Sequence, residues 1–372
     1  MTLVLNEEQQ MLRDSARNFL QERAPVSHLR ALRDEGSEDG FSRELWAEMA
    51  EMGWTAILVP EEHGGLGYGY TGLGIVLEEC GRTLTPSPLL GTAMVGVAAL
   101  VLGGTAEQSA RLLPSVAAGE TLLALACDET ARHLPRNVSL EAEEVGTGYR
   151  LSGRKTAVLD GHVADHFIVS AWTGGGSSLF LVPAAAEGVC VERYPVLDTH
   201  AAARVSFDRV EVGADDVLGT VDQGRALLSR ILDVARIGAS AELLGIAQEA
   251  FERTLVYLRE RKQFGVPIGS FQALQHRAAE LYAEIEMSKS VVLKALHELD
   301  AGADCREIAS LAKAKLSATA HRAAAEAIQM HGGIGMTDDY DIGFFLKRCR
   351  VLETFFGDRY YHLDRYAALR GY

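Results

Sequence analysis

The chain has 372 residues, which predicts two or three domains, and its 36 lysines and arginines against 51 aspartates and glutamates give a formal net charge of −15. This acidic balance argues against a general nucleic-acid binder, which needs a dense cationic face, and against a protein that binds membranes through basic residues. The hydrophobic fraction of 48% and the charged fraction of 23% predict a folded chain with large cores rather than a disordered one.

The first 120 residues carry helical patterns. Asn6 and Gln9 have the spacing of a capping box, which predicts the start of the first helix. Further helical patterns follow over residues 41–52, 72–80, 89–102 and 106–118. We therefore expect an N-terminal helical domain over residues 1–120.

Between about residues 121 and 220 the hydrophobic period falls towards two. Short alternating runs with glycine-rich breaks predict strands over residues 149–153, 166–169, 178–183, 203–207 and 210–212. This pattern predicts a middle β domain, a small antiparallel β-barrel or sandwich.

From residue 221 to residue 372 the helical period returns. Long helices are expected over residues 227–260 and 271–299. Asp304 and Glu307 have capping-box spacing ahead of a third helix, which Gly332 would end, and a fourth begins near Asp341. These helices predict a C-terminal four-helix bundle, so the expected fold class is mainly α with a central β domain.

The cysteines and the first residues indicate in which cellular compartment the protein is expected. The five cysteines are widely spaced and odd in number, which argues against a disulfide framework or a zinc ribbon, and no metal site is expected. The first residues lack the pattern of a signal peptide, and the longest apolar stretch, residues 92–102, is too short to span a bilayer. These features predict a soluble cytoplasmic protein without membrane insertion.

Residues 259–272, which read RERKQFGVPIGSFQ, place a cationic cluster at a helix end before a Gly/Pro turn. One interpretation is a solvated helix end, because the helix dipole stabilises cations there. The other is an anion clamp, in which Arg261 is held at a rigid corner and binds a pyrophosphate through two nitrogens.

Residues 329–336, which read QMHGGIGM, form a second distinctive stretch. Its three glycines permit close backbone approach to a ligand and supply unhindered N–H donors. The alternative is an ordinary helix C-cap, with His331 as a packed histidine.

Together, on a helical–β–helical plan, these two stretches resemble the acyl-CoA dehydrogenase superfamily over essentially the whole chain. The resemblance implies FAD bound between the β domain and the bundle of one subunit, a pocket completed by a second subunit, and dimers of dimers. It implies that Arg261 meets the FAD pyrophosphate across a dimer interface. The other implied cofactor contacts are Gln263, Phe264 and Gln272 at the adenosine half, and Gln329, Gly332 and Gly333 from the neighbouring chain.

The resemblance also implies a reaction in fatty acid or lipid degradation. A carboxylate removes the α-proton of an acyl-CoA thioester while the β-hydride goes to the flavin, and electron-transfer flavoprotein is the implied acceptor. Asp233 and Arg236 match family positions near the CoA moiety, although Asp233 is equally expected to be a structural partner of Arg236.

The sequence departs from the family pattern at the catalytic base. Counting from Gly335, the usual glutamate falls on Phe356, and the second habitual position falls on Ala235. Neither side chain can take a proton. Asp358 and Glu353 are the remaining candidates, with a helix cap and a helix-face charge as their structural alternatives. The β-domain stretches at residues 126–131 and 156–161 also keep little of the family pattern.

Three functions therefore stay open at this point. The first is a homomeric FAD-dependent acyl-CoA dehydrogenase with a relocated base. The second is a catalytically incomplete subunit of a heterotetramer, which completes the FAD site of a second family member. The third is a superfamily flavin monooxygenase or oxidase, which does not need the same glutamate.

Overall fold

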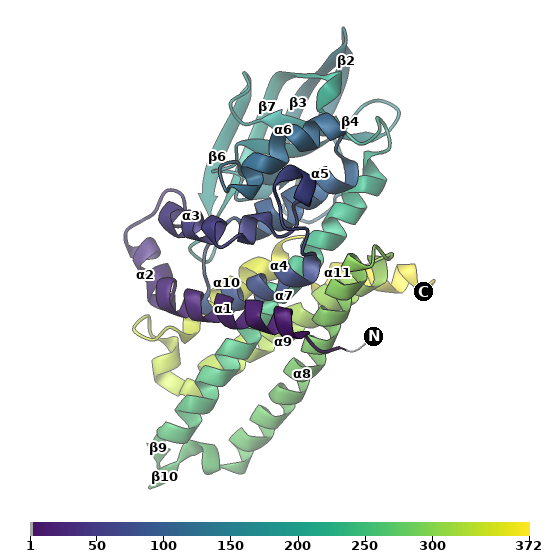
Figure 1. Cartoon of the computed structure of the whole chain (residues 1–372). Helices are drawn as coiled ribbons and strands as arrows, with labels where there is room; N and C mark the ends of the chain where they lie inside the picture. The colour runs from purple at the N-terminus through teal and green to yellow at the C-terminus, as the bar shows by residue number, and fades with distance from the viewer. Residues whose placement is uncertain (1–2) are drawn as a thin grey trace. The chain divides into compact units, whose positions relative to one another are not determined.

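The computed structural model describes residues 3–372 (Figure 1). Contacts divide the chain into two compact units. The sheet unit joins Leu32–Leu73 with Pro86–Ala235, and the bundle unit joins the described residues up to Ala31 with Gly74–Thr85 and Arg236–Tyr372. This division follows contacts in space and interleaves segments of the chain. The sequence-based boundaries near residues 120 and 220 therefore remain predictions.

Short helices form one part of the sheet unit. They are α3 (Arg43–Glu51), η1 (Trp54–Ala56), η2 (Glu61–His63), η3 (Leu89–Gly96), α5 (Val97–Gly103) and α6 (Ala106–Ala117). The indole nitrogen of Trp46 donates to the Gly119 carbonyl (2.8 Å), and the Thr55 hydroxyl donates to the Ala117 carbonyl (2.6 Å). These two bonds fasten α3 and η1 to the end of α6, and the Thr55 hydroxyl supplies a donor to the buried Ala117 carbonyl.

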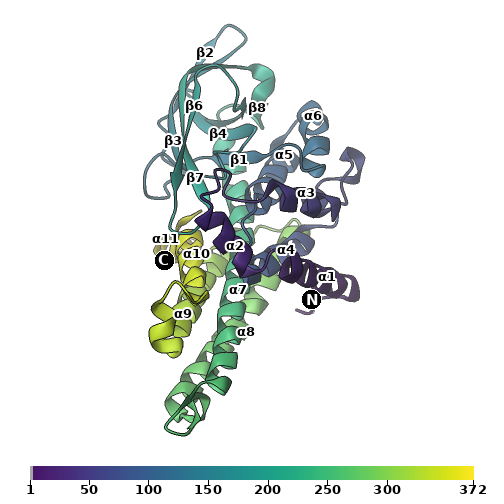
Figure 2. The ribbon, with the colours of Figure 1, turned by 90° about the vertical axis from the view of Figure 1, so that its left-hand side faces the viewer.

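A single eight-stranded sheet forms the other part (Figure 2). Its strands are β1 (Leu123–Ala126), β2 (Glu141–Val145), β3 (Gly148–Leu159), β4 (His166–Trp172), β5 (Ser177–Pro183), β6 (Val189–Pro195), β7 (Ala201–Gly213) and β8 (Val217–Leu218). The order is β6-β7-β3-β2-β4-β5-β8, with β1 beside β4. The antiparallel expectation is wrong for β1–β4 and β2–β4, which pair in parallel. Phe167, Phe180 and Phe207 lie in its buried core.

Strand β7 replaces two shorter predicted strands. Phe207 pairs with Gly153 and Val210 pairs with Leu151, so two residues on β7 lie opposite one on β3. Arg209 has φ +55° within this bulge. The polar residues that predicted a turn therefore mark a bulge, which bends the strand without ending it.

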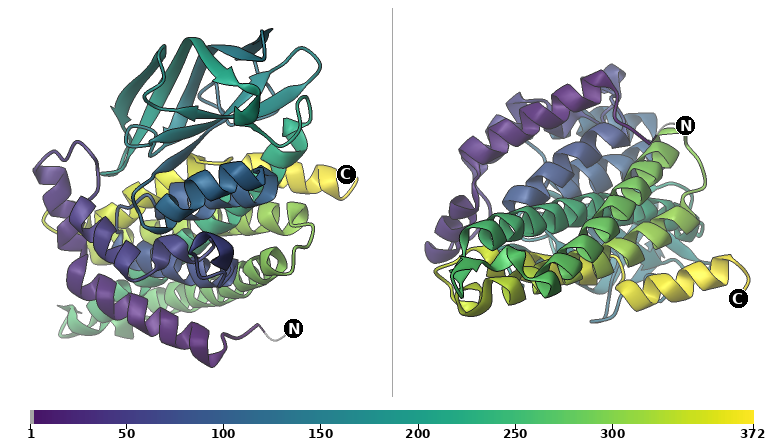
Figure 3. Two further views of the ribbon diagram at one scale, coloured as in Figure 1. Left: turned by 45° about the horizontal axis from the view of Figure 1, so that its top comes forward. Right: turned by 90° about the horizontal axis from the view of Figure 1, so that it is seen from below.

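Long helices dominate the bundle unit (Figure 3). They are α1 (Glu7–Arg23), α8 (Gln272–Asp300), α9 (Arg306–His331), α10 (Ile342–Thr354) and α11 (Arg359–Leu369), while α2 (Val26–Asp34), α4 (Tyr70–Thr83) and α7 (Gly224–Glu260) contribute residues to both units. The α9 helix packs against α8, α10 and α11. The predicted capping box of Asn6 and Gln9 is confirmed at the start of α1.

Two glycines allow α4 and α7 to approach each other closely. A Cβ atom at Gly81 would lie 2.1 Å from the Glu242 carbonyl oxygen, and one at Gly245 would lie 1.8 Å from that of Glu78. Buried Arg348 of α10 donates from Nε to the Glu242 carboxylate (2.7 Å). The charged groups at this contact are therefore paired, as buried charges must be.

Two expectations for the bundle need correction. Asp304 and Glu307 form no capping box: Cys305 is the N-cap of α9, and the Asp304 carboxylate accepts from the backbone and side chain of Arg306. The four-helix prediction also misses α11, because the helical pattern after Asp341 is interrupted between α10 and α11.

Within residues 3–372, the structure has no helix long and apolar enough to cross a membrane. No disulfide joins the five cysteines, all of which lie in that described range.

Candidate functional site

The turn between α10 and α11 has an unusual backbone. Phe356 is buried and has φ +61°, and Gly357 beside it has φ +103°. Left-handed backbone is costly for a bulky residue, on the order of 1–3 kcal/mol, and persists only where the surroundings fix it.

Three buried side chains fix this turn through its carbonyl oxygens. Arg236 Nε (3.1 Å) and His362 Nε2 (3.0 Å) both contact the Phe356 carbonyl. Lys313 Nζ donates to the carbonyls of Glu353 (3.1 Å) and Gly357 (3.0 Å). We call Arg236, Lys313 and His362 the turn clamp.

The clamp concentrates positive charge in a buried place. Burial lowers the pKa of Lys313 to about 7, with Arg236 acting in the same direction and Glu353 opposing. Burial also lowers the pKa of His362, and the cations of Arg236 and Lys313 lower it further. His362 is therefore neutral and donates its Nε2 proton to the Phe356 carbonyl.

Both carboxylates suggested as alternative bases already have partners. Asp358 caps α11 by accepting from the Tyr361 backbone N–H (2.8 Å). Glu353 is buried and accepts from Arg350 Nη1 (2.7 Å). The two residues line one cavity of about 380 Å³. A catalytic role for either stays a prediction.

The 259–272 stretch forms an exposed hairpin at the end of α7. Strand β9 (Lys262–Gln263) pairs with β10 (Val266–Pro267), and the turn residues Phe264 and Gly265 both have positive φ. Arg261 immediately precedes β9 and is exposed, and Gln272 is the exposed first residue of α8. Phe264 is 92% exposed, and the centroid of its ring lies 6.1 Å from that of the Phe271 ring.

The glycine-rich stretch ends α9 and begins the 3-10 turn η6 (Gly332–Met336). Gln329, Gly332 and Gly333 are exposed, and among the described residues nothing lies within 4 Å of a Cβ atom built on either glycine. Backbone N–H groups in such an open position can meet a ligand without hindrance.

The structure brings these two stretches together through His331. Its ring packs at 4.3 Å from the ring of Tyr257, which lies one helical turn before Arg261. On its other side it packs at 4.9 Å from Tyr340, and its Nδ1 contacts the Ala327 carbonyl (2.7 Å). The packed-histidine interpretation therefore describes its contacts here.

Arg236 has a role that sequence reasoning missed. Besides the Phe356 carbonyl, its guanidinium contacts the Tyr361 hydroxyl (3.4 Å). No sequence signal links residues 236 and 356. Asp233 is also buried on α7, and a substrate contact for Asp233 or Arg236 remains a prediction.

The sheet unit holds a second group that the sequence did not reveal. The ammonium group of buried Lys155 contacts Glu129 (2.6 Å) and the Ser170 hydroxyl (3.0 Å). Glu129 also accepts from the backbone N–H groups of Ser139 and Leu140. The segment that departs from the family pattern near residue 129 is therefore fastened to β3 and β4 by its own charge pair.

Two family models match the chain. The acyl-CoA dehydrogenase N-terminal domain matches residues 6–120, and the acyl-CoA dehydrogenase C-terminal domain matches residues 222–368. Among curated relatives, a 3-(aryl)acrylate reductase of Clostridium sporogenes is 31% identical over 95% of this chain and 96% of its own length.

Two solved structures are similar to this chain over nearly its whole length. A variant of the Tcur3481-Tcur3483 steroid ACAD is 35% identical, with a TM-score of 0.90 over 99% of this chain and 98% of that one. One chain of the ChsE4-ChsE5 complex of Mycobacterium tuberculosis is 26% identical, with a TM-score of 0.92 over 100% of this chain and 100% of that one.

Proposed function

Because the chain belongs to the acyl-CoA dehydrogenase family, whose members are FAD-dependent, we propose that it is one subunit of a heteromeric acyl-CoA dehydrogenase. In this assembly it completes the FAD site of a partner chain, and the partner supplies the catalytic base. The observation that carries the proposal is Phe356, a residue without a proton acceptor, in the clamped turn where the family resemblance places the base.

The exposed stretches of this chain suit the pyrophosphate and adenosine of FAD. A guanidinium at Arg261, amides at Gln263 and Gln329 and open backbone N–H groups at Gly332 and Gly333 are donors that bind phosphate and nucleoside groups. These residues would hold the cofactor, with Phe264 and Gln272 beside the adenosine half.

The chemistry divides between the subunits. FAD, when bound, would supply the acceptor for the hydride that leaves the β-carbon of the acyl group. Removal of the α-proton needs a carboxylate within reach of that carbon. At the clamped turn this chain presents a phenyl ring, while the carboxylates of Glu353 and Asp358 are engaged by Arg350 and by the α11 backbone.

Two solved relatives support an assembly of unlike chains, since both are named as pairs, Tcur3481-Tcur3483 and ChsE4-ChsE5. The first is also named a steroid ACAD, so we propose CoA thioesters of steroid side chains as the first substrates to test. Electron-transfer flavoprotein is the proposed acceptor.

The test compares the chain purified alone with the chain co-expressed with a second family member from the same genome. We expect colourless protein alone, even after FAD is added, and a yellow complex that bleaches anaerobically with an acyl-CoA and passes electrons to electron-transfer flavoprotein. Yellow protein that bleaches when the chain is alone would instead establish a self-sufficient homomer, and the search for its base would move to Asp358 and Glu353.

A further inference from the structure

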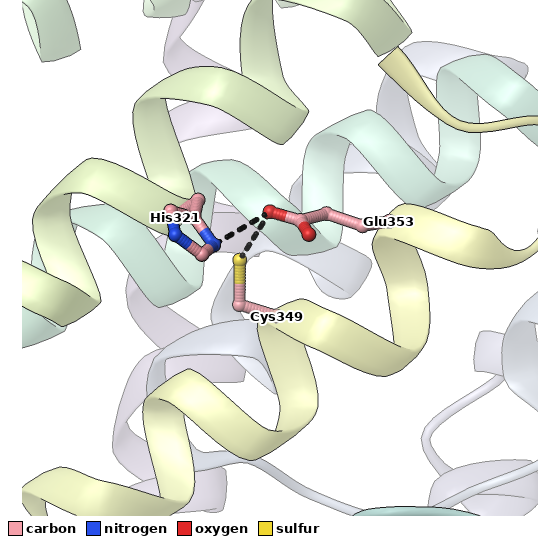
Figure 4. A group of neighbouring side chains, drawn as sticks. All are labelled: His321, Cys349 and Glu353. Carbon is pink, nitrogen blue, oxygen red and sulfur yellow. Dashed lines mark hydrogen bonds and ion pairs between the residues drawn. The ribbon is translucent and has the colours of Figure 1, made fainter. Parts of the chain in front are cut away.

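Three potential metal ligands converge between α9 and α10 (Figure 4). His321 projects from α9, and Cys349 and Glu353 project from successive turns of α10. Residues four apart on a helix share a face, so the thiol and the carboxylate meet the imidazole together. The three ligand atoms all lie within 4.8 Å of one another.

We propose that His321, Cys349 and Glu353 bind a zinc ion. Imidazole, thiolate and carboxylate are the three donor types that Zn²⁺ accepts in proteins. The sequence alone does not predict this site, because His321 and Cys349 are separated along the chain and match no short ligand motif.

Two of the three distances between ligand atoms suit tetrahedral zinc. Bond lengths of about 2.0–2.3 Å place tetrahedral ligand atoms about 3.3–3.6 Å apart. Glu353 Oε1 lies 3.2 Å from His321 Nδ1 and 3.5 Å from Cys349 Sγ. A zinc ion would replace these two contacts by bonds, and the ligand atoms of His321 and Cys349, which lie within 4.8 Å of each other, would move together on binding.

The site has an entrance and a free side. His321 and Glu353 line the cavity of about 380 Å³, and the His321 side chain is 44% exposed, whereas Cys349 is fully buried. An ion can enter from the cavity, and a water molecule there can supply the fourth ligand.

The surroundings orient the carboxylate and balance the charge. Arg350 Nη1 holds the second oxygen of Glu353 at 2.7 Å, which leaves Oε1 for the metal. Such outer contacts fix ligand orientation in metal sites. On binding, the Cys349 thiol releases its proton to solvent, so the two charges of Zn²⁺ are matched by one thiolate and one carboxylate.

The test uses the full-length chain with any affinity tag removed. After treatment with EDTA and dialysis, titration with Zn²⁺ should show one bound ion per chain by calorimetry and elemental analysis. Co²⁺ in its place should give the absorption of a thiolate-to-cobalt bond. Loss of one ligand in His321→Ala should weaken Zn²⁺ binding at least tenfold, and because the side chain is partly exposed we expect the variant to fold.

Matched controls separate this site from adventitious binding. Exposed His276 and exposed Cys190 lie elsewhere, so His276→Ala and Cys190→Ser should bind Zn²⁺ as the unmodified chain does. Cys349→Ser should abolish the thiolate–cobalt absorption. Zn²⁺ affinity unchanged in His321→Ala, or thiolate absorption that survives in Cys349→Ser, would overturn the proposal. Neither result depends on flavin or acyl-CoA.

Discussion

The clamped turn at Phe356 and the exposed stretches around Arg261 and Gly332 are opposites. In the turn, buried donors from three helices satisfy the carbonyls and hold a bulky residue at positive φ. At the exposed stretches, a cation, amides and glycines face solvent. The clamped turn has all its hydrogen-bond partners within this chain, but its Phe356 side chain cannot accept a proton. The exposed stretches carry donors that would bind groups from outside the chain.

The first region fixes the conformation of this chain, whereas the second presents groups that can bind a ligand or a second subunit. Buried polar groups that satisfy one another specify a backbone conformation. Exposed donors interact only weakly with charges while water surrounds them. Their interaction energy with a ligand becomes larger when the ligand or a second subunit excludes that water. The four predictions that follow test each side of the comparison, beginning with the largest effect.

Phe356→Glu should raise dehydrogenation by ~100-fold or more in the FAD-loaded heteromeric complex when the partner chain's own base has been removed, because a positioned base contributes roughly 10²–10⁴-fold. The clamp should present the new carboxylate from the same backbone position. The measurement is the anaerobic bleaching rate of the flavin with acyl-CoA. Phe356→Gln has the same shape as the glutamate but no proton acceptor, and it should show no gain. An unchanged rate in a Phe356→Glu protein that still binds FAD and acyl-CoA would contradict the prediction.

Arg236→Met should lower the free energy of unfolding by about 3 kcal/mol, because it leaves the buried Phe356 carbonyl without its charged donor. Urea denaturation measures this change. Arg230→Met, on the same helix but exposed, is the control and should change stability by less than about 0.5 kcal/mol. Equal effects of the two substitutions would show that the clamp does not depend on Arg236.

Arg261→Ala should weaken FAD binding by the heteromeric complex by about 1.5–3 kcal/mol, the value of a hydrogen bond to a charged group. Equilibrium titration with FAD measures the loss. Arg259→Ala removes a neighbouring exposed cation and should leave the affinity nearly unchanged. FAD affinity that survives in Arg261→Ala would remove this residue from the cofactor site.

Lys313 predicts a pH dependence of stability. Its pKa is about 7 in the folded chain and about 10.4 in an unfolded one, so between these values the unfolded state binds more protons. Stability should therefore rise with pH from 7 towards 10, with a slope of at most about 1.4 kcal/mol per pH unit. Measured in EDTA between pH 7 and 9, the slope should be smaller in Lys313→Met. Identical slopes would show that Lys313 titrates alike in both states.

Sequence patterns predicted the helical and β regions because the hydrophobic period reports directly on which face is buried. They failed at details that depend on contacts elsewhere in the chain. Asn6 caps α1 as expected, but the Asp304 carboxylate is taken by Arg306 and leaves α9 without the predicted box. The residues that predicted a turn at Arg209 form a bulge instead, since β3 continues to pair on both sides.

The candidate site was predictable only where its residues are close together in sequence. The stretches around Arg261 and Gly332 stand out because their residue types are unusual in combination. The clamp does not, because Arg236, Lys313 and His362 are separated by long stretches of helix and meet only through the carbonyls of the turn. Every residue has a backbone carbonyl, so the sequence does not show which carbonyls these side chains will contact.

The hairpin that follows α7 also has a practical consequence. Arg261 and Lys262 are adjacent and exposed at the start of a short, exposed hairpin, which makes this a favourable cleavage site for trypsin. A brief digestion of the lone chain should cut there and separate it into two fragments. Resistance of the same bond after a second chain is added would report assembly without any coloured cofactor.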